Sequence, residues 1–409
     1  MQTVDVLVVG AGLAGLRTAR LLAERGLRVL VVDRRKSVSV GVRTTGIFVR
    51  RTLDDFDLPE HLLGPGIRDV LLYPPSRRSP VRLTSERDEF RVADMGGVYE
   101  HARRAAESAG ARVVMGRRYA GVSVGSRSRG GVSVGSRSRG GVAARFVGGE
   151  PVLAHFVDAE PVEARFVVGA DGARSRVARD LGLDVNRRFL IGAEIVHPVV
   201  AGADAPAFHC VLDPRIAPGY LGWVVDDGRE AHVGVAGYAG AMRGGVRRAL
   251  DAFVADAPGH PAAAGCPGER RGGPIPVGGV LRRLACPGGL LVGDAAGAVS
   301  PLTAGGLDPC LRMAELAAAV AATYLRTGDQ RVLGRYDGGA MRSRFRGRLV
   351  LRRVFAGVRS PGAVEAAFGV LRGRAGRAAA ARVLFGDGSF PDVRARLADP
   401  AIREGLMRG

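Results

Sequence analysis

Three glycines near the start of the chain have the spacing that binds the phosphates of a dinucleotide. Gly10, Gly12 and Gly15 form a Gly-x-Gly-x-x-Gly pattern. In such a pattern the first glycine permits a tight turn, the second lets the backbone approach a pyrophosphate, and the third lets a helix pack closely on a strand. Asp33 follows about 20 residues later, where a carboxylate can accept hydrogen bonds from ribose hydroxyls.

The elements that would position these residues are recognisable around them. Residues 4–9 form a short apolar run, which is typical of a buried parallel strand. Residues 16–26 have helical periodicity and end in glycine, and residues 27–33 return to a strand pattern. Free N–H groups at the start of this helix would face the phosphates. The order of strand, glycine turn, helix, strand and acid predicts dinucleotide binding, but it does not distinguish FAD from NAD.

Two later motifs narrow the choice of cofactor. In residues 164–176, ARFVVGADGARSR, a strand pattern leads into a glycine–aspartate turn. In the third motif, residues 293–307 (GDAAGAVSPLTAGGL), a glycine and an aspartate follow another strand pattern, and a long Ala-rich helix comes next. Together with the N-terminal glycines, these motifs resemble the FAD-dependent oxidoreductases of the para-hydroxybenzoate hydroxylase type. The last motif is most similar to the geranylgeranyl reductase branch, and the resemblance covers roughly residues 1–325.

The resemblance implies FAD as the cofactor. Asp294 would bind the ribityl chain, the alternative being an ordinary helix N-cap. The backbone of residues 305–307 would face the flavin, where a helix N-terminus stabilises negative charge. Asp171 and its neighbour would lie near the pyrophosphate, and Arg43 would lie near the cofactor unless it is a surface arginine. The residues expected to bind FAD are Gly10, Ala11, Gly12, Leu13, Ala14, Gly15, Asp33, Arg34, Arg43, Asp171, Gly172, Gly293, Asp294, Pro301, Gly305, Gly306 and Leu307.

A nicotinamide cofactor would have no domain of its own, because the chain contains no second Gly-x-Gly-x-x-Gly pattern. If NADH or NADPH, here written NAD(P)H, is the electron donor, we expect it to dock transiently over the flavin.

Residues 186–277 contain strand-like runs broken by proline and glycine, and the resemblance implies an antiparallel sheet that covers the flavin. Tyr220 and Trp223 are candidates for the substrate pocket, although core packing explains the tryptophan equally well. They stand one residue further apart than in the reductase pattern. The cysteine that the branch often carries is replaced by residues 44–46, Thr-Thr-Gly, and Met95 stands where relatives have an arginine. These departures concern the substrate rather than the cofactor.

The remaining side chains predict no protein-based catalytic centre. His197, His209 and His232 show no metal-ligand spacing, so no metal site is expected. The chemistry would therefore belong to the flavin. The first hypothesis is a geranylgeranyl-reductase-like enzyme that transfers hydride to a carbon–carbon double bond of an apolar, prenyl-type substrate. The second is a flavin monooxygenase on the same fold, and the third is a flavin-containing protein that only binds a partner.

An exact ten-residue duplication occupies residues 121–140, GVSVGSRSRG written twice. Valines recur every ten residues through residues 121–170, which predicts the hairpins of a β-meander. An identical copy is more simply a recent DNA duplication tolerated at the surface than a functional device. The alternative is an Arg-Ser-rich loop that contacts a partner.

Arginine is concentrated at the C-terminus. The chain has a net charge of +20, and residues 341–409 hold 15 arginines against 5 acidic residues. Residues 341–358 have apolar positions in roughly helical spacing. We expect a helix packed on the FAD lobe with its arginines in water. The sharper alternative is a basic interfacial helix at an anionic membrane surface. Nucleic acid is not the expected partner.

No run of about 18 apolar residues is present, so no helix is expected to span a membrane. The N-terminus begins with a strand pattern rather than a signal peptide, and the four cysteines are scattered. These features predict a cytoplasmic protein, the alternative being one held at the inner face of the membrane.

The expected fold class is α/β. It combines a Rossmann-like FAD-binding domain, with βαβ units and a β-meander, an antiparallel-sheet substrate domain and a helical C-terminal extension. Three stretches would form the FAD-binding domain and two would form the substrate domain. The expected boundaries are 1–75, 91–185 and 278–330 for the FAD-binding domain, 76–90 and 186–277 for the substrate domain, and 331–409 for the extension.

Overall fold

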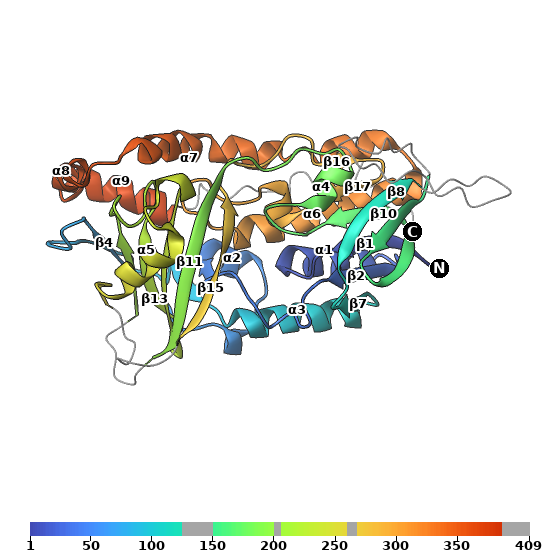
Figure 1. Ribbon diagram of the computed structural model, residues 1–409, viewed down its shortest axis with the longest axis horizontal. Helices are drawn as coiled ribbons and strands as arrows, with labels where there is room; N and C mark the ends of the chain where they lie inside the picture. The colour runs from blue at the N-terminus through green and yellow to red at the C-terminus, as the bar shows by residue number, and fades with distance from the viewer. Residues whose placement is uncertain (125–149, 200–205, 260–267, 387–409) are drawn as a thin grey trace.

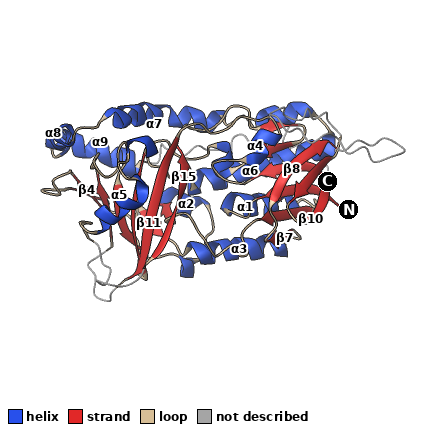
Figure 2. Ribbon diagram, in the orientation of Figure 1, coloured by secondary structure: helices blue, strands red, loops and turns tan. Residues whose placement is uncertain are grey.

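The computed structural model describes residues 1–124, 150–199, 206–259 and 268–386. Two large sheets lie at opposite ends of its long axis, with helices between and above them (Figures 1 and 2). The predicted α/β class, with a Rossmann-like lobe, an antiparallel second sheet and a helical C-terminal region, is confirmed.

The first sheet has a parallel centre of five strands in the order β17-β10-β1-β2-β7, and β16 pairs antiparallel with its edge strand β17. Its middle strands are continuous apolar runs because both of their faces are covered. The helices α1, α3 and α6 cover the sheet, and α1 packs on the other two. The bounds are β1 Gln2–Val9, β2 Val29–Asp33, β7 Arg112–Met115, β10 Ala159–Gly169, β16 Ala285–Cys286, β17 Gly289–Leu291, α1 Leu13–Ala23, α3 Met95–Ser108 and α6 Leu307–Thr327.

The β-meander forms one edge of this lobe. The strands β8 (Tyr119–Val124) and β9 (Val152–Phe156) pair antiparallel with each other, and β9 pairs with β10. The start of the first repeat copy therefore lies in β8. The rest of that copy and the whole of the second lie outside the described residues.

The second sheet has seven strands in the order β15-β11-β14-β13-β12-β4-β5. All neighbours are antiparallel except β12 and β4, which pair parallel. The sequence placed the first stretch of the substrate domain at residues 76–90. Because β4 already belongs to this sheet, the chain enters the sheet earlier than that. The strands are β4 Asp69–Tyr73, β5 Val81–Thr84, β11 Phe189–Pro198, β12 Ala207–Val211, β13 Gly222–Asp226, β14 Glu230–Gly237 and β15 Glu269–Pro276.

Side chains alternate between the two faces of the second sheet. On the outer face, Val224, Val233 and Ile195 pack with Leu250 and Phe253 of helix α5 (Gly245–Val254). We call the opposite face the inner face, because residues of the FAD-binding lobe contact it. Its members on four neighbouring strands are Leu190, Gly192, Glu194, Trp223, Val225, His232, Gly234, Ala236, Arg271, Gly273 and Ile275.

Short elements join the two lobes. A two-stranded sheet of β3 and β6 and the helix α2 follow the first βαβ unit, and α4 follows β10. The bounds are β3 Ile47–Val49, β6 Phe90–Val92, α2 Arg50–Asp55 and α4 Arg176–Asp180, with 3-10 turns at Glu60–Leu62, Ala239–Ala241, Gly293–Ala296 and Gln330–Arg335.

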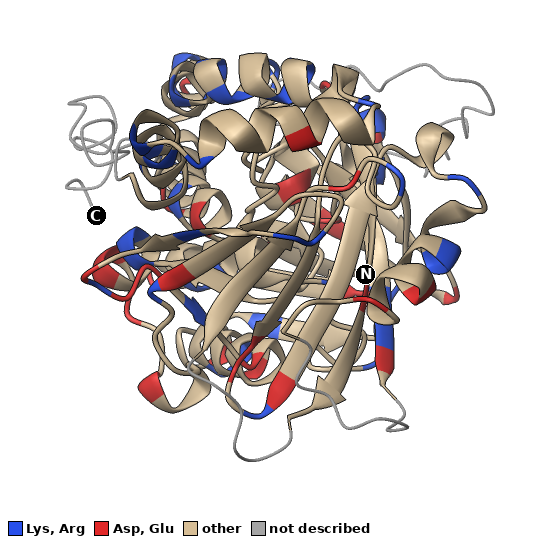
Figure 3. Ribbon diagram, turned by 90° about the vertical axis from the view of Figure 1, so that its left-hand side faces the viewer, with Lys and Arg blue, Asp and Glu red and all other residues tan. Residues whose placement is uncertain are grey.

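Three helices form the described part of the C-terminal extension: α7 (Gly339–Gly357), α8 (Pro361–Leu371) and α9 (Arg374–Phe385). In Figure 1 they run along the top of the molecule to the end that carries the second sheet. Viewed from that end, arginines mark the helices of this region (Figure 3).

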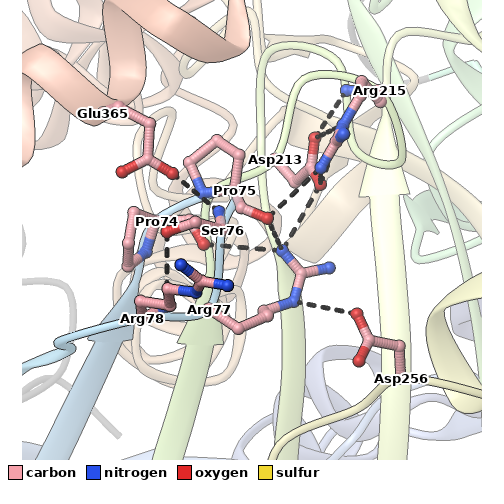
Figure 4. Close-up of polar contacts among 9 residues, drawn as sticks. All are labelled: Pro74, Pro75, Ser76, Arg77, Arg78, Asp213, Arg215, Asp256 and Glu365. Atoms are coloured by element: carbon pink, nitrogen blue, oxygen red, sulfur yellow. Dashed lines mark hydrogen bonds and ion pairs between the residues drawn. The ribbon is translucent and has the colours of Figure 1, made fainter.

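The helix α8 contacts the turn between β4 and β5 through a hydrogen bond, beside a cluster of ion pairs (Figure 4). Glu365 Oε1 accepts a hydrogen bond of 2.7 Å from the backbone N–H of Ser76. In the same turn, Arg77 lies 3.3 Å from the buried carboxylate of Asp213, which also pairs with Arg215 at 2.8 Å. The ion pairs fix the turn to the second sheet, and the Glu365 hydrogen bond attaches the C-terminal extension to that turn.

Candidate cofactor and substrate site

The glycine turn after β1 is closed on two sides and open on the third. Gly10 has φ +112°, and a Cβ atom there would lie 2.2 Å from the carbonyl oxygen of Ala170. A Cβ on Gly15 would lie 2.1 Å from the oxygen of Gly10. By contrast, no atom lies within 4 Å of the Cβ position of Gly12, the uncapped N-cap of α1. The neighbouring Ala11, Leu13 and Ala14 are buried in the turn.

Asp33, at the end of β2, faces the same turn. Its Oδ2 atom accepts a hydrogen bond of 2.8 Å from the backbone N–H of Ala11. The guanidinium of Arg35 reaches both oxygens of Asp33, at 3.2 and 3.1 Å, whereas Arg34 is exposed. Burial acts to raise the pKa of Asp33, but the hydrogen bonds and charge of Arg35 outweigh it and hold the pKa below its usual value. Arg35 was not singled out from the sequence, although it is two residues from the acid.

Asp171 and Gly172 follow β10 at the same edge of the sheet. Asp171 Oδ2 accepts hydrogen bonds from the backbone N–H groups of Arg176 (2.6 Å) and Val177 (3.1 Å). Its Oδ1 atom is buried and makes no hydrogen bond with any residue that the structure describes. Burial raises the pKa of Asp171 above its usual value. Gly172 has φ +84° and no atom within 4 Å of its Cβ position, so an approach remains open beside the carboxylate.

Gly293 and Asp294 follow β17 and pack on the first motif. A Cβ on Gly293 (φ +59°) would lie 2.8 Å from the Cβ of Ala14. Asp294 is half-buried, and burial raises the pKa of its carboxyl group to about 6. Its Oδ1 atom lies 3.5 Å from the Cβ position of Gly306, which is the N-cap of α6 and has no side-chain cap. The positive end of the α6 dipole is thus close to Asp294.

The loop before α6 carries the remaining residues of the third motif. Pro301 is buried, Gly305 is exposed, and Gly306 and Leu307 are half-buried. The loop closes on itself through a hydrogen bond of 2.9 Å from the N–H of Ser300 to the oxygen of Gly305. Arg43 is exposed, and its Cδ atom lies 3.8 Å from the Cβ position of Gly273 on the inner face of the second sheet.

Arg352 of α7 binds this loop, and nothing in the sequence motifs pointed to it. Its Nε atom donates to the oxygen of Pro301 (2.6 Å), and its Nη2 atom donates to that of Leu302 (2.7 Å). A third donor reaches the oxygen of Gly219 in the second sheet's lobe. Arg352 is only 4% exposed, so the expectation that the arginines of this helix lie in water is wrong for it.

Arg348, one turn earlier, also contacts the loop, through a hydrogen bond of 2.7 Å to Ser300 Oγ. Met341 and Phe345 are buried, and residues 348 and 352 continue the same helical spacing. That continued spacing is the signal by which the two arginines could have been found.

Tyr220 and Trp223 lie in the second sheet's lobe beside this loop. The Tyr220 hydroxyl donates to the oxygen of Thr303 at 2.5 Å, and the Arg352 guanidinium lies 5.0 Å from the centre of the Tyr220 ring. The Trp223 ring lies across Gly234 on the inner face. Within the described part of the chain, its buried Nε1 atom has no hydrogen-bond partner. Both rings join an apolar cluster whose other members are Leu190, Ala236, Tyr238, Ile275 and Val277.

Comparison with known proteins identifies the lobe and the chain. Residues 3–58 match the model of an FAD binding domain. A digeranylgeranylglycerophospholipid reductase from Methanopyrus kandleri is 31% identical to 80% of this chain, over 82% of its own length. The chain belongs to this reductase family. The family's Picrophilus torridus member is 28% identical over 81% of the chain and 82% of its own length.

Solved structures show the same fold. A geranylgeranyl bacteriochlorophyll reductase-like protein from Thermoplasma acidophilum superimposes with a TM-score of 0.75 at 24% identity, covering 98% of this chain and 99% of its own. A p-nitrophenol 4-monooxygenase from Pseudomonas putida gives a TM-score of 0.66 at 17% identity, covering 95% and 99%. The protein is therefore an FAD-dependent oxidoreductase of the reductase family, on a fold that monooxygenases also use.

The geometry fits FAD. The ends of β1, β2, β10 and β17 bring Gly12, Asp33, Asp171 and Asp294 to one edge of the parallel sheet, where α/β folds bind dinucleotides. The open side of Gly12 leaves room for a pyrophosphate, and the unpartnered Asp171 Oδ1 is a buried acceptor for a hydroxyl or a water.

Among the residues that the structure describes, no helix has the length and apolar character needed to cross a bilayer.

Proposed function

We propose that this member of the reductase family reduces carbon–carbon double bonds in a prenyl-type apolar substrate. The observation that carries the proposal is the 31% identity to a digeranylgeranylglycerophospholipid reductase along 82% of that protein's length. The apolar cluster around Tyr220 and Trp223 supports it, because it adjoins the loop of the third motif. Apolar side chains with few polar groups are what such a substrate requires of its pocket.

The cofactor-binding roles follow from the edge of the sheet. When bound, reduced FAD supplies the hydride. The backbone at Gly12 would hold the pyrophosphate. Asp33 would bind the ribose after Arg35 gives up some of its hydrogen bonds to the Asp33 carboxylate. Asp294 would bind the ribityl chain beside the uncapped N-terminus of α6, whose dipole favours negative charge on the flavin.

Other residues would position these groups and exclude water. Arg352 and Arg348 hold the loop that leads into α6, so this loop keeps its shape when the cofactor binds. The inner face of the second sheet would cover the site, with Trp223 lining the substrate pocket. Exclusion of water strengthens each electrostatic contact in the site.

NAD(P)H is the proposed transient electron donor. The sequence has no second Gly-x-Gly-x-x-Gly pattern, so such a donor would have no nicotinamide domain of its own. The donor would approach the flavin directly and leave after reducing it.

We also propose that the extension contacts a membrane surface on the cytoplasmic side. Val350, Leu351, Val354 and Phe355 of α7 are exposed apolar residues, between 38% and 60% exposed. Arg353 is exposed among them. Apolar side chains with flanking arginines suit an interface of anionic lipids.

A monooxygenase on the same fold is the second candidate, because the structures that match include p-nitrophenol 4-monooxygenase. The two functions differ in what reoxidises the flavin. In a reductase, the reduced flavin transfers its electrons to an alkene. In a monooxygenase, it reacts with oxygen, and the oxygen consumed matches the substrate converted.

The deciding experiment is an anaerobic titration followed by the flavin spectrum. NADH, NADPH and dithionite are added in turn to FAD-loaded protein, and a geranylgeranyl lipid is then added to the reduced enzyme. We expect a donor to bleach the flavin absorption and the lipid to restore it without oxygen, with a saturated product by mass spectrometry. Restoration only by oxygen, with an oxygenated product, would favour the monooxygenase. Protein that folds but takes up no FAD would contradict both functions.

A further inference from the structure

The polar end of the inner face surrounds a cavity whose lining includes none of the residues expected to bind FAD. The cavity measures about 170 Å³ and lies between the β13–β14 hairpin, the loop before β3 and the start of α3. Its lining includes Thr44, Thr45, Asp94, Asp227, Glu230, His232 and Arg271.

Three side chains of the hairpin direct metal-binding atoms to one point. One oxygen each of Asp227 and Glu230 and one nitrogen of His232 all lie within 4.8 Å of one another. Asp227 Oδ1 is occupied, because it accepts hydrogen bonds from the N–H groups of Arg229 (2.8 Å) and Glu230 (2.6 Å). Its Oδ2 atom is 4.0 Å from His232 Nε2. The histidines show no ligand spacing in the sequence, because the hairpin turn brings His232 together with the two acidic residues.

His232 lines the cavity as a buried imidazole, 2% exposed. Neither of its ring nitrogens makes a hydrogen bond with a residue that the structure describes. Buried polar atoms are normally satisfied, so a ligand in the cavity would supply the partner that these residues do not.

A carboxylate lies behind the ring, as is usual for imidazole metal ligands. Glu194 Oε2 is 3.9 Å from His232 Nδ1, on the side away from Asp227. Thr45 holds this carboxylate through a hydrogen bond of 2.7 Å from its Oγ1 atom. A proton on Nδ1 directed at Glu194 leaves the lone pair of Nε2 facing the cavity.

The charges around the cavity favour a cation. Glu194, Asp227, Glu230 and Asp94 contribute four carboxylates. Against them stands the single charge of Arg271, whose Nη2 atom pairs with Glu269 at 2.7 Å and which also attracts Glu194 and Glu230. A bound cation would offset the excess negative charge and satisfy the imidazole.

We propose that Asp227, Glu230 and His232 bind one divalent first-row cation, with Glu194 orienting the imidazole. Two carboxylate oxygens and one imidazole nitrogen suit a cation such as Mn²⁺ or Zn²⁺, and water would complete its coordination. The cation would brace the hairpin where it meets the FAD-binding lobe, away from the apolar end of the inner face.

The test is Mn²⁺ binding to the untagged full-length chain after removal of metals with EDTA, followed by the electron paramagnetic resonance signal of free Mn²⁺. Mn²⁺ is the probe because the thiols of Cys210, Cys286 and Cys310 prefer softer cations. We expect one Mn²⁺ per chain, binding at least tenfold more weakly in His232→Gln and Glu230→Gln. Glu194→Gln should weaken binding about 10- to 100-fold.

His101→Gln, an exposed histidine of α3, is the matched control and should bind Mn²⁺ like the wild type. FAD content and the thermal midpoint verify that each variant folds. Because Glu230 is exposed, Glu230→Gln tests the site even if the buried variants do not fold. The proposal is overturned if the wild type binds no Mn²⁺ at millimolar concentration, or if folded Glu230→Gln and His232→Gln bind it as tightly as the wild type.

Discussion

At the scale of single residues, the three glycines of the first motif serve different purposes. Gly10 and Gly15 are required by the protein itself, since any side chain there would overlap backbone atoms. Gly12 is not, because its φ of −82° suits any residue and its Cβ position is open. The sequence pattern predicts a role for each of the three glycines. Only the structure distinguishes the two that folding requires from the one that a ligand can approach.

This difference predicts the effect of Gly12→Ala. The apoprotein should fold with a thermal midpoint within about 2 °C of the wild type, because the methyl group meets no protein atom. FAD should bind at least tenfold more weakly, because the methyl group occupies the side on which the pyrophosphate would approach. The measurements are fluorescence titration with FAD and thermal unfolding of the apoprotein.

Two further substitutions are controls for Gly12→Ala. Gly369→Ala on exposed α8, also with an open Cβ position, should change neither FAD affinity nor folding. Gly15→Ala should impair folding itself. Unchanged FAD affinity in Gly12→Ala would show that the cofactor does not approach the turn from this side.

At the scale of elements, α7 connects the extension to the cofactor site. The Arg352 guanidinium contacts backbone oxygens of the third motif and of the second sheet's lobe, so one side chain joins three segments. These partners are 51 and 133 residues away in the sequence. A local pattern predicts that α7 is a helix, but it does not predict which distant carbonyl groups an inward-facing arginine will meet.

We expect Arg352→Lys to loosen the third motif although the charge is kept. A lysine ammonium cannot replace the planar guanidinium at several diverging carbonyl oxygens. Leaving buried acceptors unpaired should lower the free energy of unfolding by roughly 2–4 kcal/mol. FAD should bind more weakly, and the flavin circular dichroism should change because the loop before α6 shifts.

Arg353→Lys is the matched control, because Arg353 is the next residue along the helix and its side chain is exposed. It should leave stability, FAD affinity and the dichroism signal unchanged. If Arg352→Lys lowers stability but the bound flavin keeps its spectrum and affinity, Arg352 supports the fold without positioning the cofactor.

At the scale of the whole molecule, the sequence predicts the two lobes better than the way they join. The βαβ unit and the glycine–aspartate motifs are local, and their strands lie in the expected parallel sheet. The early entry of β4 into the second sheet and its parallel pairing with β12 were not predicted, because that pairing joins residues 138 apart, such as Asp69 and Ala207. Likewise, the contact of Thr45 with Glu194 depends on how the lobes meet.

The arrangement of the whole molecule also places the proposed membrane surface beside the cofactor site. One side of α7 carries Arg348 and Arg352, which hold the third motif, and the opposite side carries the exposed Val350 and Val354. A helix is only about 10 Å across, so a lipid surface on α7 would lie close to the loop before α6. An apolar substrate could then reach the site with little exposure to water.

This arrangement predicts that Val350→Glu combined with Val354→Glu reduces sedimentation with vesicles containing anionic phosphatidylglycerol at least fivefold. Added carboxylates oppose both the apolar contact and the attraction of neighbouring arginines to anionic lipid. Turnover of a detergent-dispersed lipid should persist, because neither side chain contacts the third motif. Val157→Glu adds the same charge to an exposed valine of the meander and should leave sedimentation unchanged. Equal sedimentation of the double variant and the wild type would remove α7 from the membrane contact, since no other property of the vesicles differs between the two samples.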